Sequence, residues 1–193
     1  MRAFDPVRLG NAEADAWVAY YRREWAKFLR AAITMVRTGF ALSWPRSVQG
    51  AWYVLRGNQL WAPFPENDAA GAREQMRRFY TLVSRAHHQT YDVDEAARLE
   101  IGWWRAHREL QHRDVYPEAT EEGLVDALAA LYAHVYEVPV ESVREAAAGR
   151  AKAMAVSDSW VAAGRDPASP ALDEERAELI RGYTALRAAV GGD

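Results

Sequence analysis

The chain has 193 residues, half of them hydrophobic, and a net charge of −3, which is typical of one globular domain with a sizeable core. It contains no cysteine, which excludes disulfides, thiolate metal ligands and cysteine nucleophiles. Its 24 basic residues are interspersed with 27 acidic ones, so neither nucleic acid nor an anionic membrane is expected as a partner. Eight tryptophans and nine tyrosines predict a bulky, aromatic-rich core.

Membrane and strand signals are both absent from the sequence. No stretch approaches 18 consecutive apolar residues, and the N-terminus lacks the apolar segment of a signal peptide, so we expect a cytoplasmic protein. Apolar residues recur at helical spacing instead of alternating. The sequence therefore predicts an all-α fold, a single-domain up-and-down bundle of six to seven helices over residues 1–193.

The first half of the chain is expected to form three helices. The first spans 11–40, with Asn11 as its N-cap. The second spans 46–61 after a start at Ser43-Trp44-Pro45, and it is apolar almost all round, so we place it inside or across the bundle. The third spans 69–88 and is capped by Asn67 or Asp68.

The second half is expected to form four more helices. They span 93–113, 118–137, 140–163 and, after a linker at 165–171, 172–190. The last helix carries an apolar stripe with Leu172, Leu179, Tyr183, Leu186 and Val190. Such a stripe predicts either a helix docked on its own chain or a homodimer contact.

The helix at 93–113 carries polar residues on both of its faces. At about 100° per residue, Glu100 and His107 share the apolar face with the paired tryptophans at 103 and 104. Glu109 and His112 have the Glu-x-x-His spacing of di-iron bundles, but they lie on the opposite, wet face. The informative pair is therefore Glu100 with His107.

Helical phase places six polar residues on or beside apolar faces. Buried charges need partners, and three carboxylates here face one guanidinium. Imidazolium rings, protonated carboxyls or a divalent metal would balance them. The six residues are Glu24, His87, Glu100, His107, Arg150 and Asp158.

One hypothesis is a metal site in a non-haem metal-dependent oxidoreductase that acts on a small molecule. Carboxylates and imidazoles projected inward from several helices bind iron or manganese in helical bundles. The metal ligands would be Glu24, His87, Glu100 and His107. Arg150 and Asp158 would be the catalytic residues, with Arg150 orienting an acidic substrate group.

The alternative hypothesis is a non-catalytic bundle whose polar cluster is structural. Arg150 would then bridge Glu100 or Glu24, and Asp158 would accept a hydrogen bond from a histidine. Such a protein would bind a partner protein or an apolar or haem-like ligand, with His107 or His87 as the axial residue of a haem. The sequence does not choose between the two hypotheses.

Overall fold

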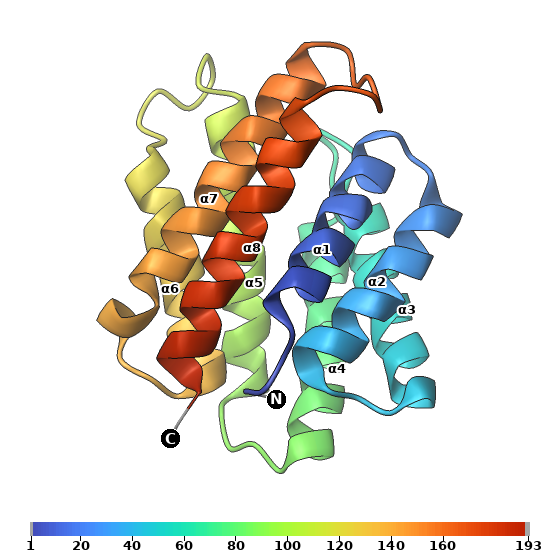
Figure 1. Cartoon of the computed structure of the whole chain (residues 1–193), viewed down its shortest axis with the longest axis vertical. Coiled ribbons are helices and arrows are strands. Elements are labelled where there is room, and N and C mark those ends of the chain that lie inside the picture. The colour runs from blue at the N-terminus through green and yellow to red at the C-terminus, as the bar shows by residue number, and fades with distance from the viewer. Residues whose placement is uncertain (1, 192–193) are drawn as a thin grey trace.

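The computed structural model describes residues 2–191, and every regular element in this range is an α-helix (Figure 1). This confirms the all-α class, but the helices number eight instead of six to seven. In chain order they are α1 (Pro6–Tyr21), α2 (Trp25–Phe40), α3 (Trp44–Trp61), α4 (Ala69–His87), α5 (Val93–Gln111), α6 (Glu121–Tyr136), α7 (Val140–Ala162) and α8 (Ala171–Val190).

The helices form a closed ring. Each helix packs against the next one in the chain, and α8 packs back against α1. The connections alternate between the two ends of the bundle, which gives the up-and-down arrangement seen in Figure 1. Within residues 2–191, no helix is both long and apolar enough to span a membrane.

The single helix predicted at 11–40 is wrong, because the chain breaks between α1 and α2. Arg23 has a φ of 59°, and the backbone N–H of Glu24 donates to the carbonyl of Ala19, which ends α1. No glycine or proline marks this break in the sequence. The start differs as well, since Asp5 rather than Asn11 caps α1, accepting from the backbone N–H groups of residues 7 and 8.

The interior position predicted for the 46–61 helix is also wrong. Only one side of α3 faces the ring, where Gly50, Val54 and Gly57 are buried. The opposite side leaves Trp44, Val48 and Trp52 exposed by 57%, 38% and 51%. Apolar residues on every side of α3 therefore do not show that it is enclosed, because the face with Trp44, Val48 and Trp52 is exposed and no helix within residues 2–191 covers it.

The other helix boundaries follow the sequence more closely. Asp68 caps α4 and Asp92 caps α5, both through side-chain hydrogen bonds to backbone N–H groups. The stripe of α8 (Leu172, Leu179, Tyr183, Leu186 and Val190) is buried against its own chain. This is the docked alternative, and a homodimer through α8 would have to use its other faces.

Helices α7 and α8 approach each other through two glycines. A Cβ added to Gly149 would lie 2.8 Å from the Cα of Gly182, and one added to Gly182 would lie 3.1 Å from the carbonyl oxygen of Ala146. The obstructing atoms belong to the backbone, so they cannot turn aside as a flexible side chain would. The close approach of α7 and α8 therefore requires glycine at both positions.

We expect Gly149→Ala to lower the free energy of unfolding by about 1–3 kcal/mol, because the methyl group must push two helices apart. Urea denaturation followed by circular dichroism measures the loss. Gly102→Ala is the matched control, since a Cβ at Gly102 meets no atom within 4 Å. It should gain up to about 1 kcal/mol from helix propensity. Equal stability of the two variants would contradict the close approach.

Candidate functional site

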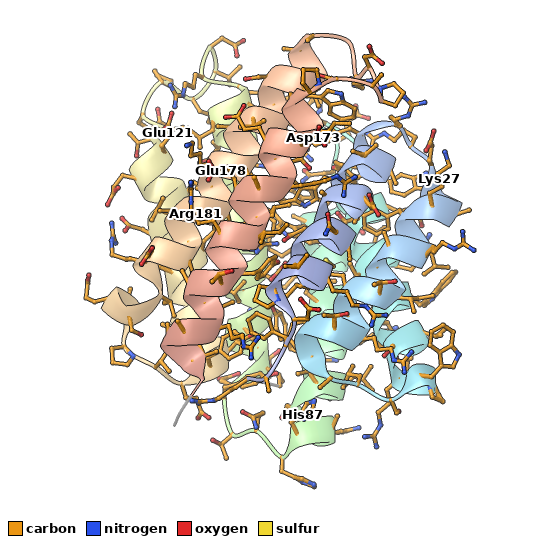
Figure 2. All side chains as sticks on the ribbon, viewed as in Figure 1. Lys27, His87, Glu121, Asp173, Glu178 and Arg181 are labelled. Carbon is orange, nitrogen blue, oxygen red and sulfur yellow. The ribbon has the colours of Figure 1, made fainter. Side chains whose placement is uncertain are left out.

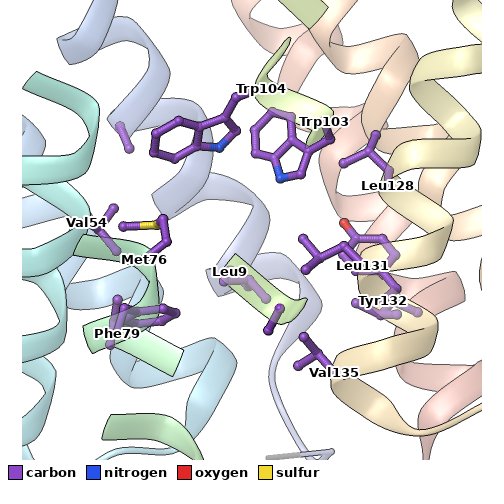
Figure 3. Close-up of a cluster of buried hydrophobic side chains, with 14 of the residues drawn as sticks. Leu9, Val54, Met76, Phe79, Trp103, Trp104, Leu128, Leu131, Tyr132 and Val135 are labelled. Atoms are coloured by element: carbon purple, nitrogen blue, oxygen red, sulfur yellow. The ribbon is translucent and has the colours of Figure 1, made fainter. Parts of the chain in front are cut away.

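A cavity of about 140 Å³ lies at the centre of the ring, and all eight helices contribute to its lining. Figure 3 shows its apolar walls, with Val54, Met76 and Phe79 on one side and Leu131 and Val135 on the other. A second cavity of about 80 Å³ adjoins it. The two share five lining residues, Trp17, Phe28, Asn58, Trp103 and Trp104.

The paired tryptophans of α5 stand between the two cavities. Both are buried, as the sequence predicted, and their rings meet edge to face with centroids 6.1 Å apart. Figure 3 shows both indole nitrogens directed toward the central space. The Nε1–H of Trp104 donates to Glu100, whereas that of Trp103 forms no well-aligned hydrogen bond among the described residues, although it lies near enough to Glu100 to help lower the pKa of that carboxyl. A buried donor without an acceptor is unfavourable and uncommon.

The most deeply buried polar contact of the cavity is an ion pair between Glu13 and Arg150. Glu13 is 1% exposed, and Nε of Arg150 donates to its Oε1 over 3.0 Å. The hydroxyl of Tyr183 donates to the other oxygen of the same carboxylate. The guanidinium carbon of Arg150 also lies 4.5 Å from the ring centroid of Trp103. Both charges are therefore compensated inside the protein.

Glu100 is the second carboxylate of the central cavity. It accepts hydrogen bonds from the hydroxyl of Tyr80 over 2.7 Å and from Trp104 over 3.1 Å. Burial raises the pKa of Glu100, and the positive charge of Arg150 offsets part of that effect. Because Arg150 is already paired with Glu13, an ionised Glu100 leaves the cavity with one negative charge that no cation within residues 2–191 balances.

A separate hydrogen-bond network lies beside the smaller cavity. Nε2 of His107 lies 3.0 Å from Oδ2 of Asp158, and the amide of Gln111 donates to Oδ1 of the same carboxylate over 2.6 Å. Burial, with the nearby charge of Asp158, raises the pKa of Tyr21, which stays protonated and lies beside this carboxylate. This is the Asp–His contact expected for the structural hypothesis.

The structure distributes the six candidate residues over four places. Glu100 and Arg150 line the central cavity, and His107 and Asp158 lie beside the smaller one. Glu24 instead precedes α2, where hydrogen bonds from Lys27 and Arg22 lower the pKa of its carboxyl. His87 ends α4 and donates to the carbonyl of Phe40.

The four predicted metal ligands do not share one centre. Figure 2 shows His87 at one end of the bundle and Lys27, the partner of Glu24, toward the other end. Across the described part of the chain, no group of three or more histidine, aspartate or glutamate side chains could hold a metal ion. The geometry therefore gives the metal hypothesis no support.

Sequence reasoning missed three buried carboxylates, of which Glu178 pairs with Lys152 and Arg181 and the other two are Glu13 and Glu175. Glu13 lies within the helix predicted at 11–40 and precedes Trp17 of its apolar stripe by one turn. Glu175 fills the seven-residue gap between Leu172 and Leu179 in the stripe of α8. The signal was available in both cases, as an acidic residue in phase with an apolar stripe.

Glu175 is fully buried and forms no salt bridge among residues 2–191. The nearby hydroxyl of Ser157 and the charge of Arg176 offset only part of the cost of burying its carboxylate. Burial raises the pKa of Glu175 to about 7. Its charge therefore opposes folding at alkaline pH.

Comparison with protein-family models, with curated protein sequences and with solved structures gives no significant match. The function is accordingly inferred from the chemistry of the cavities.

We expect Arg150→Met to lower the free energy of unfolding by about 3–5 kcal/mol, because it leaves the carboxylate of Glu13 buried without a counter-ion. Thermal or urea unfolding measures the loss. Arg144→Met is the control, since Arg144 pairs with Glu122 and Asp126 at the surface, where a pair contributes about 1 kcal/mol or less. Similar losses in the two variants would contradict the burial of the Glu13 pair.

The stability of the protein should depend on pH through the buried carboxyl of Glu175. Between pH 4.5 and about 7, Glu175 ionises only in the unfolded chain, so its contribution to stability falls as the pH rises. The stability of Glu175→Gln relative to the parent should therefore increase by about 3 kcal/mol between pH 4.5 and pH 8. Urea denaturation at several pH values measures this difference. A difference that does not change with pH would show that Glu175 titrates normally.

Proposed function

We propose that the protein binds a compact, largely apolar molecule in its central cavity and does not act on it chemically. The observation that carries this proposal is the cavity itself, together with the Nε1–H of Trp103 in its wall, which forms no well-aligned hydrogen bond among the described residues. An apolar cavity of roughly 150 Å³ accepts a molecule of the size of benzene. The volume of about 140 Å³ here suits a single ring with one or two small substituents.

The walls supply both of the features that small-molecule sites combine. Aromatic and aliphatic side chains remove the body of the ligand from water, and a small number of polar groups set its orientation. Trp103 offers a donor, so the ligand should carry one hydrogen-bond acceptor, such as a hydroxyl or carbonyl oxygen. Arg150 is held by Glu13 before any ligand arrives, so no charged side chain needs to reorganise on binding.

A non-catalytic role agrees better with the polar groups than a metal-dependent oxidation does. The oxidoreductase hypothesis needs Glu24, His87, Glu100 and His107 around one metal ion, and these side chains have separate partners. Each of these contacts is one that a structural network would make. Binding of an apolar molecule therefore requires no metal ion in the cavity.

We expect toluene and p-cresol to raise the unfolding temperature, because a molecule that binds only the folded state stabilises it by mass action, by about 2.7 kcal/mol at one hundred times its Kd. The cresol hydroxyl can accept from Trp103, so p-cresol should give the larger shift. Differential scanning fluorimetry measures the shifts, and tryptophan fluorescence provides a second readout at Trp103 and Trp104.

Two variants separate the cavity from other binding places. Val135→Phe puts a ring into the cavity wall and should abolish both shifts, whereas Val138→Phe, three residues away and outside the lining, should leave them. Trp103→Phe keeps an aromatic ring and removes the N–H, so the advantage of p-cresol over toluene should disappear. Shifts that persist in Val135→Phe would contradict the proposal.

A further inference from the structure

The outer face of α3 carries an exposed apolar stripe. Trp44, Val48 and Trp52 follow one another at intervals of four residues, which places them along the same side of the helix. Two tryptophans with more than half of their surface in water are unusual in a protein whose other tryptophans pack inside or against the core. A contiguous exposed apolar surface of this kind marks an interaction site.

The same part of the chain has a distinctive charge. Basic and acidic residues are mixed over most of the sequence, but residues 25–65 contain no aspartate or glutamate. They contain five basic residues, Lys27, Arg30, Arg37, Arg46 and Arg56. Because the whole chain has a net charge of −3, the other residues together carry −8. The α2–α3 hairpin is thus a positive region on a negative protein.

Most of these cations lack an acidic partner. Arg30, Arg37, Arg46 and Arg56 are all exposed, and within residues 2–191 none of them forms a salt bridge. The guanidinium of Arg37 lies 5.6 Å from the ring centroid of Trp44. Positive charge and exposed aromatic surface therefore coincide.

A groove adjoins the stripe at Trp44. It has a volume of about 420 Å³ and is lined by the apolar residues Leu29 and Ile33, by three arginines (Arg8, Arg30 and Arg37) and by no acidic residue. Its floor is apolar and its rim is cationic. A ridge of apolar side chains flanked by carboxylates would match it in both shape and charge.

We infer that this face, formed by α2, α3 and the groove beside Trp44, is a docking surface for an acidic amphipathic helix of a partner protein. The partner's apolar residues, spaced by three and four, pack on Trp44, Val48 and Trp52. Its flanking glutamates meet the unpaired arginines, which raises the rate of association and sets the orientation. A concave groove favours such a ridge over a flat membrane surface.

The test uses a fluorescein-labelled 18-residue peptide of glutamate, alanine and leucine with leucines at helical spacing, and a scrambled peptide of the same composition. Fluorescence anisotropy in 50 mM salt should show saturable binding of the first peptide and at least tenfold weaker binding of the second. Binding should weaken at least fivefold in 300 mM salt, because exposed charges are then screened.

Matched variants assign the binding to this face. Trp44→Ala with Trp52→Ala, and separately Arg30→Gln with Arg37→Gln, should each weaken binding at least tenfold. Arg85→Gln with Arg105→Gln, which removes two exposed arginines elsewhere, should change it less than twofold. All of these side chains are exposed, so circular dichroism should show the same fold and unfolding temperature in every variant.

Several results would overturn the inference. Absence of peptide binding, or equal binding of the scrambled peptide, would do so. A concentration-dependent dimer that the tryptophan changes abolish would assign the face to a second copy of the chain. Binding to vesicles of phosphatidylcholine and phosphatidylglycerol that the same changes abolish would assign it to a membrane surface. The outcome does not depend on whether the central cavity holds a ligand.

Discussion

The buried pair of Glu13 and Arg150 is the contact on which the interior depends. Its guanidinium extends from α7, pairs with a carboxylate on α1, contacts a tryptophan on α5 and approaches a tyrosine hydroxyl on α6. The carboxylate also accepts from Tyr183 on α8, so five of the eight helices meet at one pair of charges. Since either charge alone would be strongly unfavourable in this position, these helices are held in one mutual register.

The central cavity follows from the way the ring is packed. On one side, α7 and α8 touch through glycine and their axes come close. Toward the centre, the large rings of Trp103, Trp104 and Phe79 line the cavity. Rigid aromatic rings cannot collapse into every gap, so space remains beside them. The polar groups then occupy the wall, where their hydrogen bonds can be completed from neighbouring helices.

Helical periodicity was sufficient to predict the fold class and which way many side chains face. Glu100 and His107 point inward and Asp158 accepts from a histidine, as their phase indicated. Phase describes the angle around a helix but not the height along the bundle. His87 and Glu100 both face inward, yet His87 ends its helix while Glu100 lies in the middle of the next.

Local backbone geometry limited the prediction further. The left-handed Arg23 ends α1 without a glycine, and the phase assigned to Glu24 from a continuous helix was lost with it. The start of α1 was placed too late as well, although Asp5-Pro6 is a good capping pair. Pairings between distant helices, such as Glu13 with Arg150, depend on the ring closure, which no local pattern encodes.

Ring closure also has a consequence for how the molecule assembles. Seven of the eight main interfaces join helices that are neighbours in the chain, so each can form at a small loss of chain entropy. The eighth joins α8 to α1, and its contact between Tyr183 and Glu13 spans 170 residues. Contacts of such long range are slow to form. Until α8 has docked on α1, the cavity lacks the part of its wall formed by Tyr183 and Leu186, and Glu13 lacks its hydrogen bond from Tyr183.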